Sequence, residues 1–217
     1  MPKEIIIFPF GGNARESLLS ILAVNNIKKT WKVVAFIDDD RSQWGKTCCG
    51  IEVKGGRDIL KKSPEAMVLA VPGNPDNYLR RKSIIESLGI ERRRFATIIH
   101  PSVIVAADAK VGYNVTMLPN VFISCGAKIG NHCVILPNTV ISHDTVIGDY
   151  SCVGSNVAIS GNVSIGVGCY IGSGVNIREN ISIGKGSFLG LGSNVISDIK
   201  EGVIAAGNPA RVIRKAR

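Results

Sequence analysis

The chain has 217 residues, enough for one large or two modest domains, and its 45% hydrophobic content is ordinary for a globular protein. No apolar stretch is long enough to cross a bilayer, and Glu4 and Gly11-Gly12-Asn13 interrupt the N-terminal apolar run, unlike a signal peptide. The net charge of +9 comes without a nucleic-acid-binding motif, so nucleic acid is not an expected partner. We expect a cytoplasmic protein without membrane insertion.

Residues 1–100 alternate between strand and helix patterns. The expected strands are Glu4–Pro9, Trp31–Ile37, Ala66–Val71 and Arg94–Ile99, and the expected helices are Ala14–Asn25 and Pro75–Leu88. This alternation predicts a small parallel sheet with helices on its faces, a Rossmann-like α/β domain. Ligands of such sheets bind beyond the carboxyl ends of the strands. Those ends carry Gly11, Gly12, Asn13, Asp38, Asp39, Gly73 and Asn74.

The first of these turns matches a phosphate-binding fingerprint only loosely. A dinucleotide-binding turn reads G-x-G-x-x-G, whereas this one reads Phe8-Pro9-Phe10-Gly11-Gly12-Asn13. Backbone amides at the start of the following helix would still favour a phosphate. This segment alone is compatible with nucleotide binding and equally with a plain tight turn.

In the second part of the chain, residues 101–217, every sixth residue from Val105 to Val195 is aliphatic. Neither a helix, with its period of about 3.6, nor a strand, with its period of 2, gives such a pattern. A hexapeptide period indicates a parallel β-helix, in which each of these residues plugs the interior and three hexapeptides make one coil. The plugs are Val105, Val111, Met117, Ile123, Ile129, Ile135, Ile141, Ile147, Val153, Ile159, Ile165, Ile171, Ile177, Ile183, Leu189 and Val195.

Two other positions of the hexapeptide are also biased. The fourth residue after a plug is small or β-branched and is expected to point inward near a corner; Cys133 and Cys169 occupy it as small buried residues of a reduced protein. The residue after a plug is often Gly, as at Gly112 and Gly148, which we expect to serve tight bends with positive φ. Residues 202–217 leave the register and are expected to fold back as a cap.

His143 is the most informative polar residue of the repeat. Residues eighteen apart stack on successive coils, so Gly161 lies next to His143 and leaves open space and an accessible N–H. This arrangement would suit a general base beside an oxyanion donor, although a solvated histidine beside a corner glycine fits equally well. Asp144 follows, but adjacent strand residues point to opposite faces, so it orients His143 only if the chain bends there; otherwise the acid comes from another subunit. The three histidines, His100, His132 and His143, do not predict a metal site.

Several segments together carry a resemblance to a known family. They are Gly11-Gly12-Asn13-Ala14-Arg15, Phe36-Ile37-Asp38-Asp39, Ile99-His100-Pro101, the stretch 140–148, Gly161-Asn162-Val163 and Gly207-Asn208-Pro209-Ala210-Arg211. The chain resembles the sialic acid O-acetyltransferase-type sugar acetyltransferases, which are left-handed β-helix hexapeptide acyltransferases. It is most similar to those that N-acetylate nucleotide-linked 4-amino-4,6-dideoxysugars in glycan biosynthesis.

The resemblance implies roles for individual residues. His143 matches the catalytic base, Asp144 its supporting acid and Gly161 the donor to the thioester oxygen. The N-terminal turn and Asp38-Asp39 match the nucleotide-sugar pocket, and Cys152 stands where some relatives have a second histidine. Acetyl-CoA is expected between the β-helices of a homotrimer, and the expected cofactor-binding residues are Gly161, Gly172, Ser173, Gly190, Gly207, Pro209 and Arg211.

We therefore expect a two-domain chain, with a nucleotide-sugar-binding α/β domain at 1–100 and a left-handed β-helix acetyltransferase domain with a C-terminal cap at 101–217. The expected activity is acetyl-CoA-dependent N-acetylation of a nucleotide-linked amino sugar, without a metal. Two alternatives are a sugar O-acetyltransferase of the sialic acid type and a non-catalytic β-helical scaffold. The sequence leaves the nucleotide and the sugar stereochemistry open.

Overall fold

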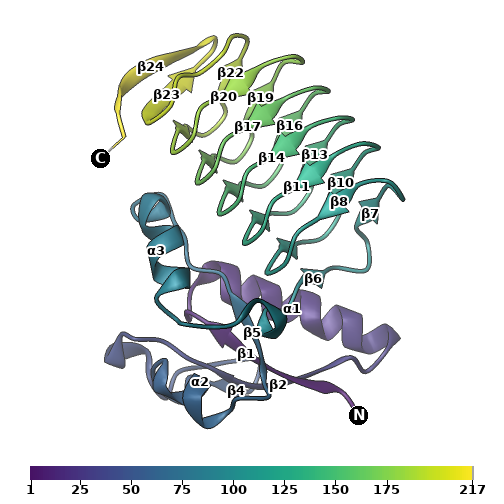
Figure 1. Cartoon of the computed structure of the whole chain (residues 1–217), viewed down its shortest axis with the longest axis vertical. Helices are drawn as coiled ribbons and strands as arrows, with labels where there is room; N and C mark the ends of the chain where they lie inside the picture. The colour runs from purple at the N-terminus through teal and green to yellow at the C-terminus, as the bar shows by residue number, and fades with distance from the viewer. Residues whose placement is uncertain (217) are drawn as a thin grey trace.

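The structure, a computed structural model, describes residues 1–216; residue 217, within the predicted second domain, lies outside the described residues. A small sheet with helices occupies one end of the molecule, and a long solenoid of flat coils extends from it (Figure 1). No helix within residues 1–216 combines the length and the apolar content needed to span a membrane.

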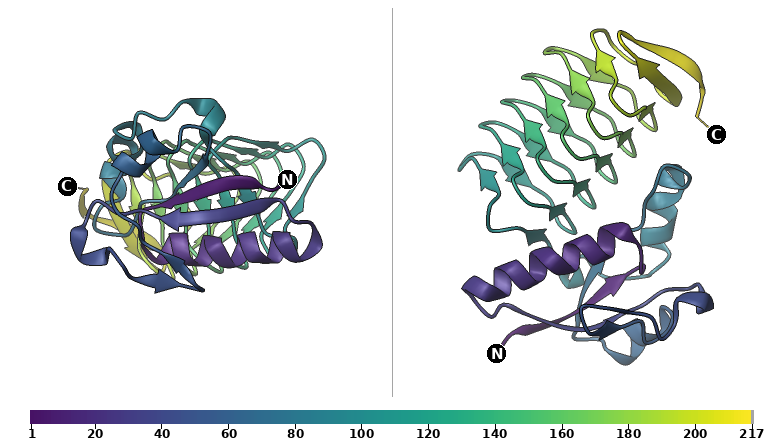
Figure 2. Two further views of the ribbon diagram at one scale, coloured as in Figure 1. Left: turned by 90° about the horizontal axis from the view of Figure 1, so that it is seen from below. Right: turned by 180° about the vertical axis from the view of Figure 1, so that it is seen from behind.

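The N-terminal sheet has three parallel strands in the order β2-β1-β5. They are β1 (Lys3–Phe8), β2 (Trp31–Phe36) and β5 (Met67–Ala70). Helix α1 (Gly12–Ile27) lies between this sheet and the solenoid (Figure 2), because its buried residues Ala14, Leu18 and Ile21 pack into one cluster with residues of both parts. The predicted parallel sheet is confirmed.

Shorter elements complete this part. They are η1 (Arg41–Gln43), β3 (Thr47–Cys48), β4 (Ile51–Glu52), α2 (Asp58–Lys62), η2 (Tyr78–Arg80), α3 (Arg81–Glu86) and η3 (Arg92–Arg94). The helix predicted for Pro75–Leu88 is wrong in its first half, since the Asn74 side chain accepts the N–H groups of Asp76 and Asn77 and holds a turn. The strand predicted for Arg94–Ile99 is divided between the two parts. Phe95 forms an isolated parallel bridge with Val68 of β5, and only Ile98–Ile99 is a strand, which pairs with the solenoid.

The solenoid has three parallel sheets, one for each side of the prism. The docking face holds β6 (Ile98–Ile99), β9 (Thr116–Met117), β12 (Val134–Ile135), β15 (Cys152–Val153), β18 (Tyr170–Ile171), β21 (Phe188–Leu189) and the hairpin β23 (Val203–Gly207) and β24 (Ala210–Lys215). The apolar face holds β7 (Ile104–Val105), β10 (Phe122–Ile123), β13 (Val140–Ile141), β16 (Ala158–Ile159), β19 (Asn176–Ile177) and β22 (Asn194–Val195). The polar face holds β8 (Lys110–Val111), β11 (Lys128–Ile129), β14 (Val146–Ile147), β17 (Ser164–Ile165) and β20 (Ser182–Ile183).

Stacked plugs form the core of the solenoid. Ile123 pairs with Ile141 and Ile141 with Ile159, so partners are eighteen residues apart, as the hexapeptide register predicts. Almost all of the plugs are buried in one cluster, together with inward corner residues such as Cys133 and Cys169. The predicted parallel β-solenoid is confirmed.

The expectation about glycine bends is wrong, and the reason lies in how the coils stack. For the plugs from Val111 to Leu189, positive φ occurs at the third residue after the plug, at Asn114 and Asn162 for example, and not at the glycine that follows the plug. A Cβ on Gly112 or Gly148 would lie within 2.8 Å of the backbone of the next coil. Glycine is therefore needed after the plug for close approach. The bends themselves are formed mostly by Asn and by other glycines, which tolerate the left-handed region.

The N-terminal part docks on the solenoid through a buried polar joint. The Asn114 side chain accepts the Ala70 N–H at 2.9 Å and donates to the Ala70 carbonyl at 2.7 Å. Its amide also lies 2.9 Å from Nδ1 of His132, whose ring stacks on Tyr150 with centroids 4.7 Å apart. His132 is only 3% exposed, and burial lowers its pKa from 6.5 to about 4.

This lowered pKa predicts a loss of stability in mild acid. Below pH 6.5 the unfolded chain protonates His132, whereas the folded protein does not until about pH 4, so the free energy of unfolding falls over this window. The shift corresponds to about 3 kcal/mol. His132→Phe keeps the ring stacking and does not titrate. Denaturant unfolding at pH 7 and pH 4 should therefore show a smaller loss of unfolding free energy in the variant than in the wild type. Equal losses would contradict this prediction.

Candidate functional site

His143 and Asp144 lie on the edge of the prism between the apolar face and the polar face. They follow β13 and precede β14, so this edge is opposite the docking face. We call it the catalytic edge because it carries the predicted base. The chain does bend there, because Asp144 adopts φ +57. Its side chain consequently lies beside that of His143, with 2.9 Å between Nδ1 and Oδ2. The bend that Asp144 needs in order to orient His143 is therefore present within a single chain.

This contact determines which ring nitrogen of His143 is free. A carboxylate can only accept a hydrogen bond, so the proton of a neutral imidazole lies on Nδ1 and Nε2 keeps a lone pair. The two side chains are 54% and 61% exposed, so residues 1–216 of one chain do not enclose them. The pair has the geometry of an oriented base at an open surface.

Two glycines make room for the pair. A Cβ on Gly161 would overlap the imidazole of His143, and one on Gly126 would overlap the carboxylate of Asp144. Gly161 is the coil neighbour that the eighteen-residue stacking predicts. Its N–H donates no hydrogen bond to residues 1–216. A free N–H therefore lies beside the ring.

A cleft of about 320 Å³ begins one coil beyond His143 on the apolar face. Ser160, next to Gly161, lines it together with Arg178 and Glu179. Sequence reasoning missed Ser160 and Arg178, although the stacking rule places both in the column of Ser142, beside His143.

The carboxyl edge of the N-terminal sheet gathers five of the predicted substrate-binding residues. Gly11 and Gly12 begin α1 without a side-chain cap, and the amide of Asn13 donates to the Gly73 carbonyl at 3.0 Å. Asp38 accepts the Phe10 N–H at 2.9 Å. This cluster combines the backbone N–H groups at the start of α1 with one carboxylate.

The other two predicted substrate-binding residues, Asp39 and Asn74, are engaged in contacts within the N-terminal part. The two oxygens of Asp39 accept hydrogen bonds from Nε of Arg57 at 3.1 and 3.0 Å, and this contact lowers the pKa of Asp39. Asn74 holds the turn described above. Neither side chain is free in this arrangement.

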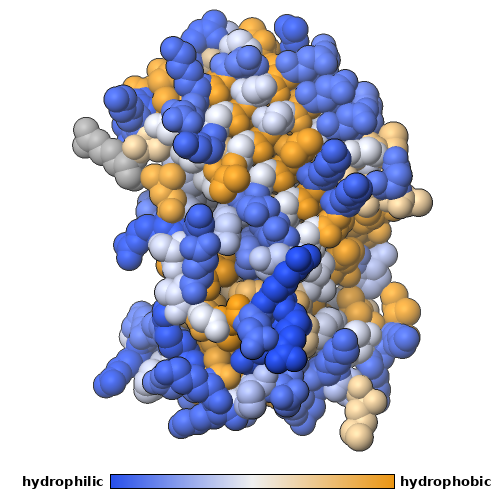
Figure 3. Space-filling view, in the orientation of Figure 1, coloured by the Kyte–Doolittle hydropathy of each residue, from blue (hydrophilic) through white to orange (hydrophobic). Residues whose placement is uncertain are grey.

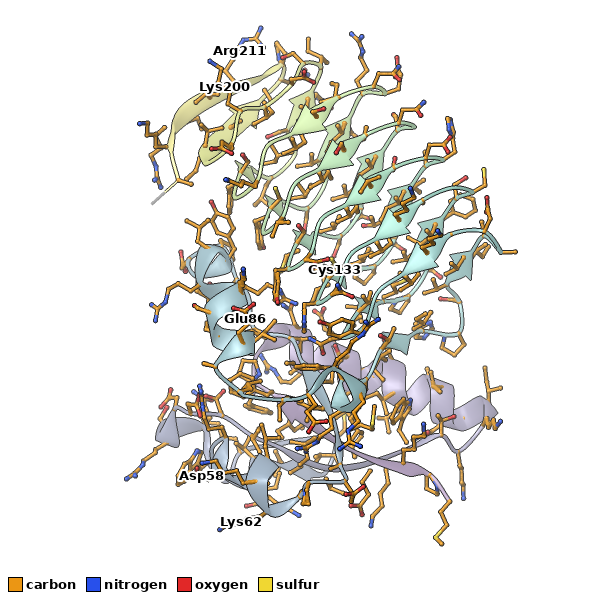
Figure 4. The ribbon with its side chains drawn as sticks, viewed as in Figure 1. Asp58, Lys62, Glu86, Cys133, Lys200 and Arg211 are labelled. Atoms are coloured by element: carbon orange, nitrogen blue, oxygen red, sulfur yellow. The ribbon has the colours of Figure 1, made fainter. Side chains whose placement is uncertain are left out.

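The expected cofactor-binding residues do not gather around His143 in one chain. Gly172, Ser173 and Gly190 lie at the edge between the docking face and the apolar face, whereas Gly161 lies at the catalytic edge. Gly207, Pro209 and Arg211 belong to the hairpin at the far end of the solenoid, where Figure 4 labels Arg211. A Cβ on Gly172 would lie 2.7 Å from the Leu189 carbonyl oxygen, so coil stacking already requires this glycine.

Cys152 also lies away from His143. It is 6% exposed on the docking face, in the cluster that α1 covers. Within one chain, the nucleotide-pocket residues and the catalytic edge are thus on different sides of the solenoid.

Comparisons with known proteins place this geometry in context. The family model of the GMPPB C-terminal domain matches residues 95–198, and no curated protein matches the chain. A mutant of the GDP-perosamine N-acetyl transferase from Caulobacter crescentus, solved with CoA and GDP-perosamine, is 25% identical, with 98% of this chain and 97% of that chain covered and a TM-score of 0.83. The acetyltransferase domain of PglB from Neisseria gonorrhoeae is 24% identical, with 97% and 100% covered and a TM-score of 0.85. WeeI from Acinetobacter baumannii is 21% identical, with 98% and 100% covered and a TM-score of 0.73.

The chain is a structural relative of sugar acetyltransferases. The resemblance predicted from the sequence is confirmed, and it extends over both the N-terminal part and the solenoid. Among these acetyltransferases, both the PglB domain and the perosamine enzyme have been solved with coenzyme A species, acetyl coenzyme A in the first case and CoA in the second.

Gly161→Ala should displace the His143 ring, because the new Cβ would overlap it. A crystal structure of the variant should show a different side-chain rotamer at His143 and a lost contact with Asp144. Cys125→Ala changes the other neighbour of His143 in the same column and should leave the ring in place. An unmoved ring in Gly161→Ala would refute the steric argument.

Proposed function

We propose that this chain is an acetyl-CoA-dependent N-acetyltransferase that acts on the amino group of a nucleotide-linked amino sugar, with a 4-amino-4,6-dideoxyhexose as the expected acceptor. The observation that carries the proposal is the His143–Asp144 pair beside the free N–H of Gly161. The match to a GDP-perosamine N-acetyl transferase over 98% of the chain supports it.

In the proposed reaction the neutral sugar amine attacks the thioester carbon. Nε2 of His143 removes the amine proton as the C–N bond forms, and Asp144 stabilises the imidazolium. The Gly161 N–H donates to the oxyanion. The C–S bond then breaks, and the imidazolium returns its proton to the leaving thiolate of coenzyme A.

The nucleotide part of the acceptor is assigned to the carboxyl edge of the N-terminal sheet. Parallel sheets bind ligands at this edge, and the uncapped start of α1 offers N–H groups to phosphates. The acetyl-CoA is assigned to the cleft beyond His143, where Arg178 supplies a cation. The division at residue 100, the Rossmann-like character of the first domain and the left-handed sense of the coil belong to the same proposal. A reducing, cytoplasmic location fits the six unpaired cysteines.

A homotrimer completes the proposal, and the three faces of the solenoid support it. The docking face is covered by the N-terminal part, and the polar face presents Lys110 and Lys128. The apolar face instead exposes Ile104, Phe122 and Val140 as a column on successive coils. The space-filling view shows such apolar residues reaching the surface along the solenoid (Figure 3).

A closed ring buries one such face on every subunit with a single repeated contact. It would also cover the half-exposed His143 with a neighbour. The nucleotide pocket of one subunit, which in its own chain lies away from the catalytic edge, would then serve the His143 of the next. This arrangement accounts for the separation of the two sets of residues.

His143→Ala should fold normally and lose roughly 10² to 10⁴-fold in kcat, since a general base contributes about this much. Asp144→Asn should lose less, because Asp144 orients the base and does not take the proton. Thiol release from acetyl-CoA with a panel of nucleotide-linked amino sugars measures both. Asp108→Asn, a carboxylate of the same column two coils earlier, is the matched control and should retain activity. Near-wild-type turnover of His143→Ala would refute the mechanism.

Val140→Glu should dissociate the trimer, because it places a charge in the proposed interface. Val146→Glu, on the polar face, changes an equally exposed valine (39% against 41%) and should leave the trimer intact. Light scattering should give three times 23.1 kDa for the wild type and the control, and a lower mass for Val140→Glu. The dissociated variant should also lose activity.

Subunit mixing tests whether the site is shared. His143→Ala subunits mixed with Asp38→Ala subunits should regain part of the activity, because some contacts then pair an intact base with an intact pocket. A wild-type monomer with full activity would overturn the shared site.

A further inference from the structure

Arg81 is a completely buried guanidinium in the joint between the two parts of the molecule. It begins α3, and its Nε and Nη2 donate to the His132 carbonyl at 3.2 and 2.7 Å. Its Nη1 has no hydrogen-bond partner. No carboxylate of residues 1–216 forms an ion pair with it. A buried charge without a counter-ion is costly for stability, so its presence calls for another explanation.

The unpaired nitrogen faces the loop after β5. A Cβ built on Gly73 would lie 3.0 Å from Nη1 and 3.2 Å from the Cys152 sulfur. The carbonyl of the same Gly73 accepts the Asn13 amide at the start of α1. The charge of Arg81 therefore lies directly behind the loop that contacts the start of this helix.

A second source of positive potential meets it at the same place. Helix α1 has 16 residues, and its first turn has neither a side-chain cap nor an acidic residue. Such a helix start attracts anions through its free N–H groups and its dipole. The neighbouring carboxylate, Asp38, accepts the N–H groups of Phe10 and Asp40, and these hydrogen bonds offset part of its negative charge.

We propose that Arg81 is the fixed counter-charge for the diphosphate of the nucleotide-linked sugar, acting from behind Gly73 on a diphosphate at the start of α1. This inference rests on the proposed function and adds a residue to it. Arg81 is a positioning residue, because the loop separates it from the ligand. Its field passes through a protein interior, which screens a charge far less than water does.

Isothermal titration calorimetry on the full-length protein tests the inference. It measures the affinities for GDP, UDP and dTDP, each compared with the affinity for the corresponding nucleoside. Arg81→Gln retains a donor for the His132 carbonyl and removes the charge, whereas Arg81→Lys retains the charge. We expect Arg81→Gln to weaken the tightest diphosphate by about tenfold or more and to leave its nucleoside unchanged. Arg81→Lys should stay within about threefold of wild type. Equal weakening of diphosphate and nucleoside, or no weakening, would overturn the inference.

A second pair of variants leaves Arg81 in place. Cys152→Asp puts a carboxylate beside the guanidinium, because the Cys152 sulfur and Nη1 adjoin the same point above Gly73. It should reproduce the loss of diphosphate affinity, whereas the equally sized Cys152→Asn should not. Should Arg81→Gln fail to fold, this pair decides alone, and equal affinities in the two variants would refute the counter-charge.

The outcome also separates this inference from the proposed function. If the protein acetylates nucleotide-linked amino sugars but its diphosphate affinity is unchanged in these variants, only the role of Arg81 is refuted. A wild-type protein that releases no thiol with any member of the panel refutes the proposed function itself.

Discussion

The stacking of one aliphatic side chain on the next, coil after coil, is the constraint on which the rest of the molecule depends. From Val105 to Ile177, each plug pairs with the residue eighteen positions further on, as Ile141 does with Ile159. A shift by one residue would expose the whole buried column, so the register is strongly determined. Because the register is fixed, every outward residue also has a fixed neighbour. The contact between His143 and Gly161 is one consequence of packing inside the prism.

The same register explains why the periodic part of the molecule could be predicted and why some of its details were missed. Burial of the plugs follows from the period alone. The position of Asp144 beside His143 did not follow from strand alternation, because alternation fails where φ becomes positive. A signal was present: Asn, Asp, His or Gly recurs at the third residue after the plug, and these residues favour the left-handed region. The glycine after the plug was the more conspicuous feature, but it serves coil stacking.

The N-terminal part was predictable only where the pattern is local. Its three sheet strands have clear apolar runs, and the structure contains all three. The start of α3 depends on the Asn74 turn, and the assignment of Ile98–Ile99 to the solenoid depends on pairing with Thr116–Met117. No local pattern reveals such partners. The burial of Arg81 was not predictable from the sequence either, because Arg81 lies in the basic run Arg80-Arg81-Lys82 and such a run usually indicates a solvated surface.

The polar joint gives the two parts a fixed relation that a flexible linker would not. Asn114 belongs to the solenoid and both donates to and accepts from Ala70, at the end of β5. The loop that follows β5 carries Gly73, which contacts the start of α1. The position of the proposed nucleotide pocket is thereby set relative to the coils. If the coils of a neighbouring subunit stack against the apolar face, the distance from that pocket to the neighbour's catalytic edge is set by rigid packing alone. Catalysis between subunits needs such precision, because the reacting amine must lie within hydrogen-bond reach of the base.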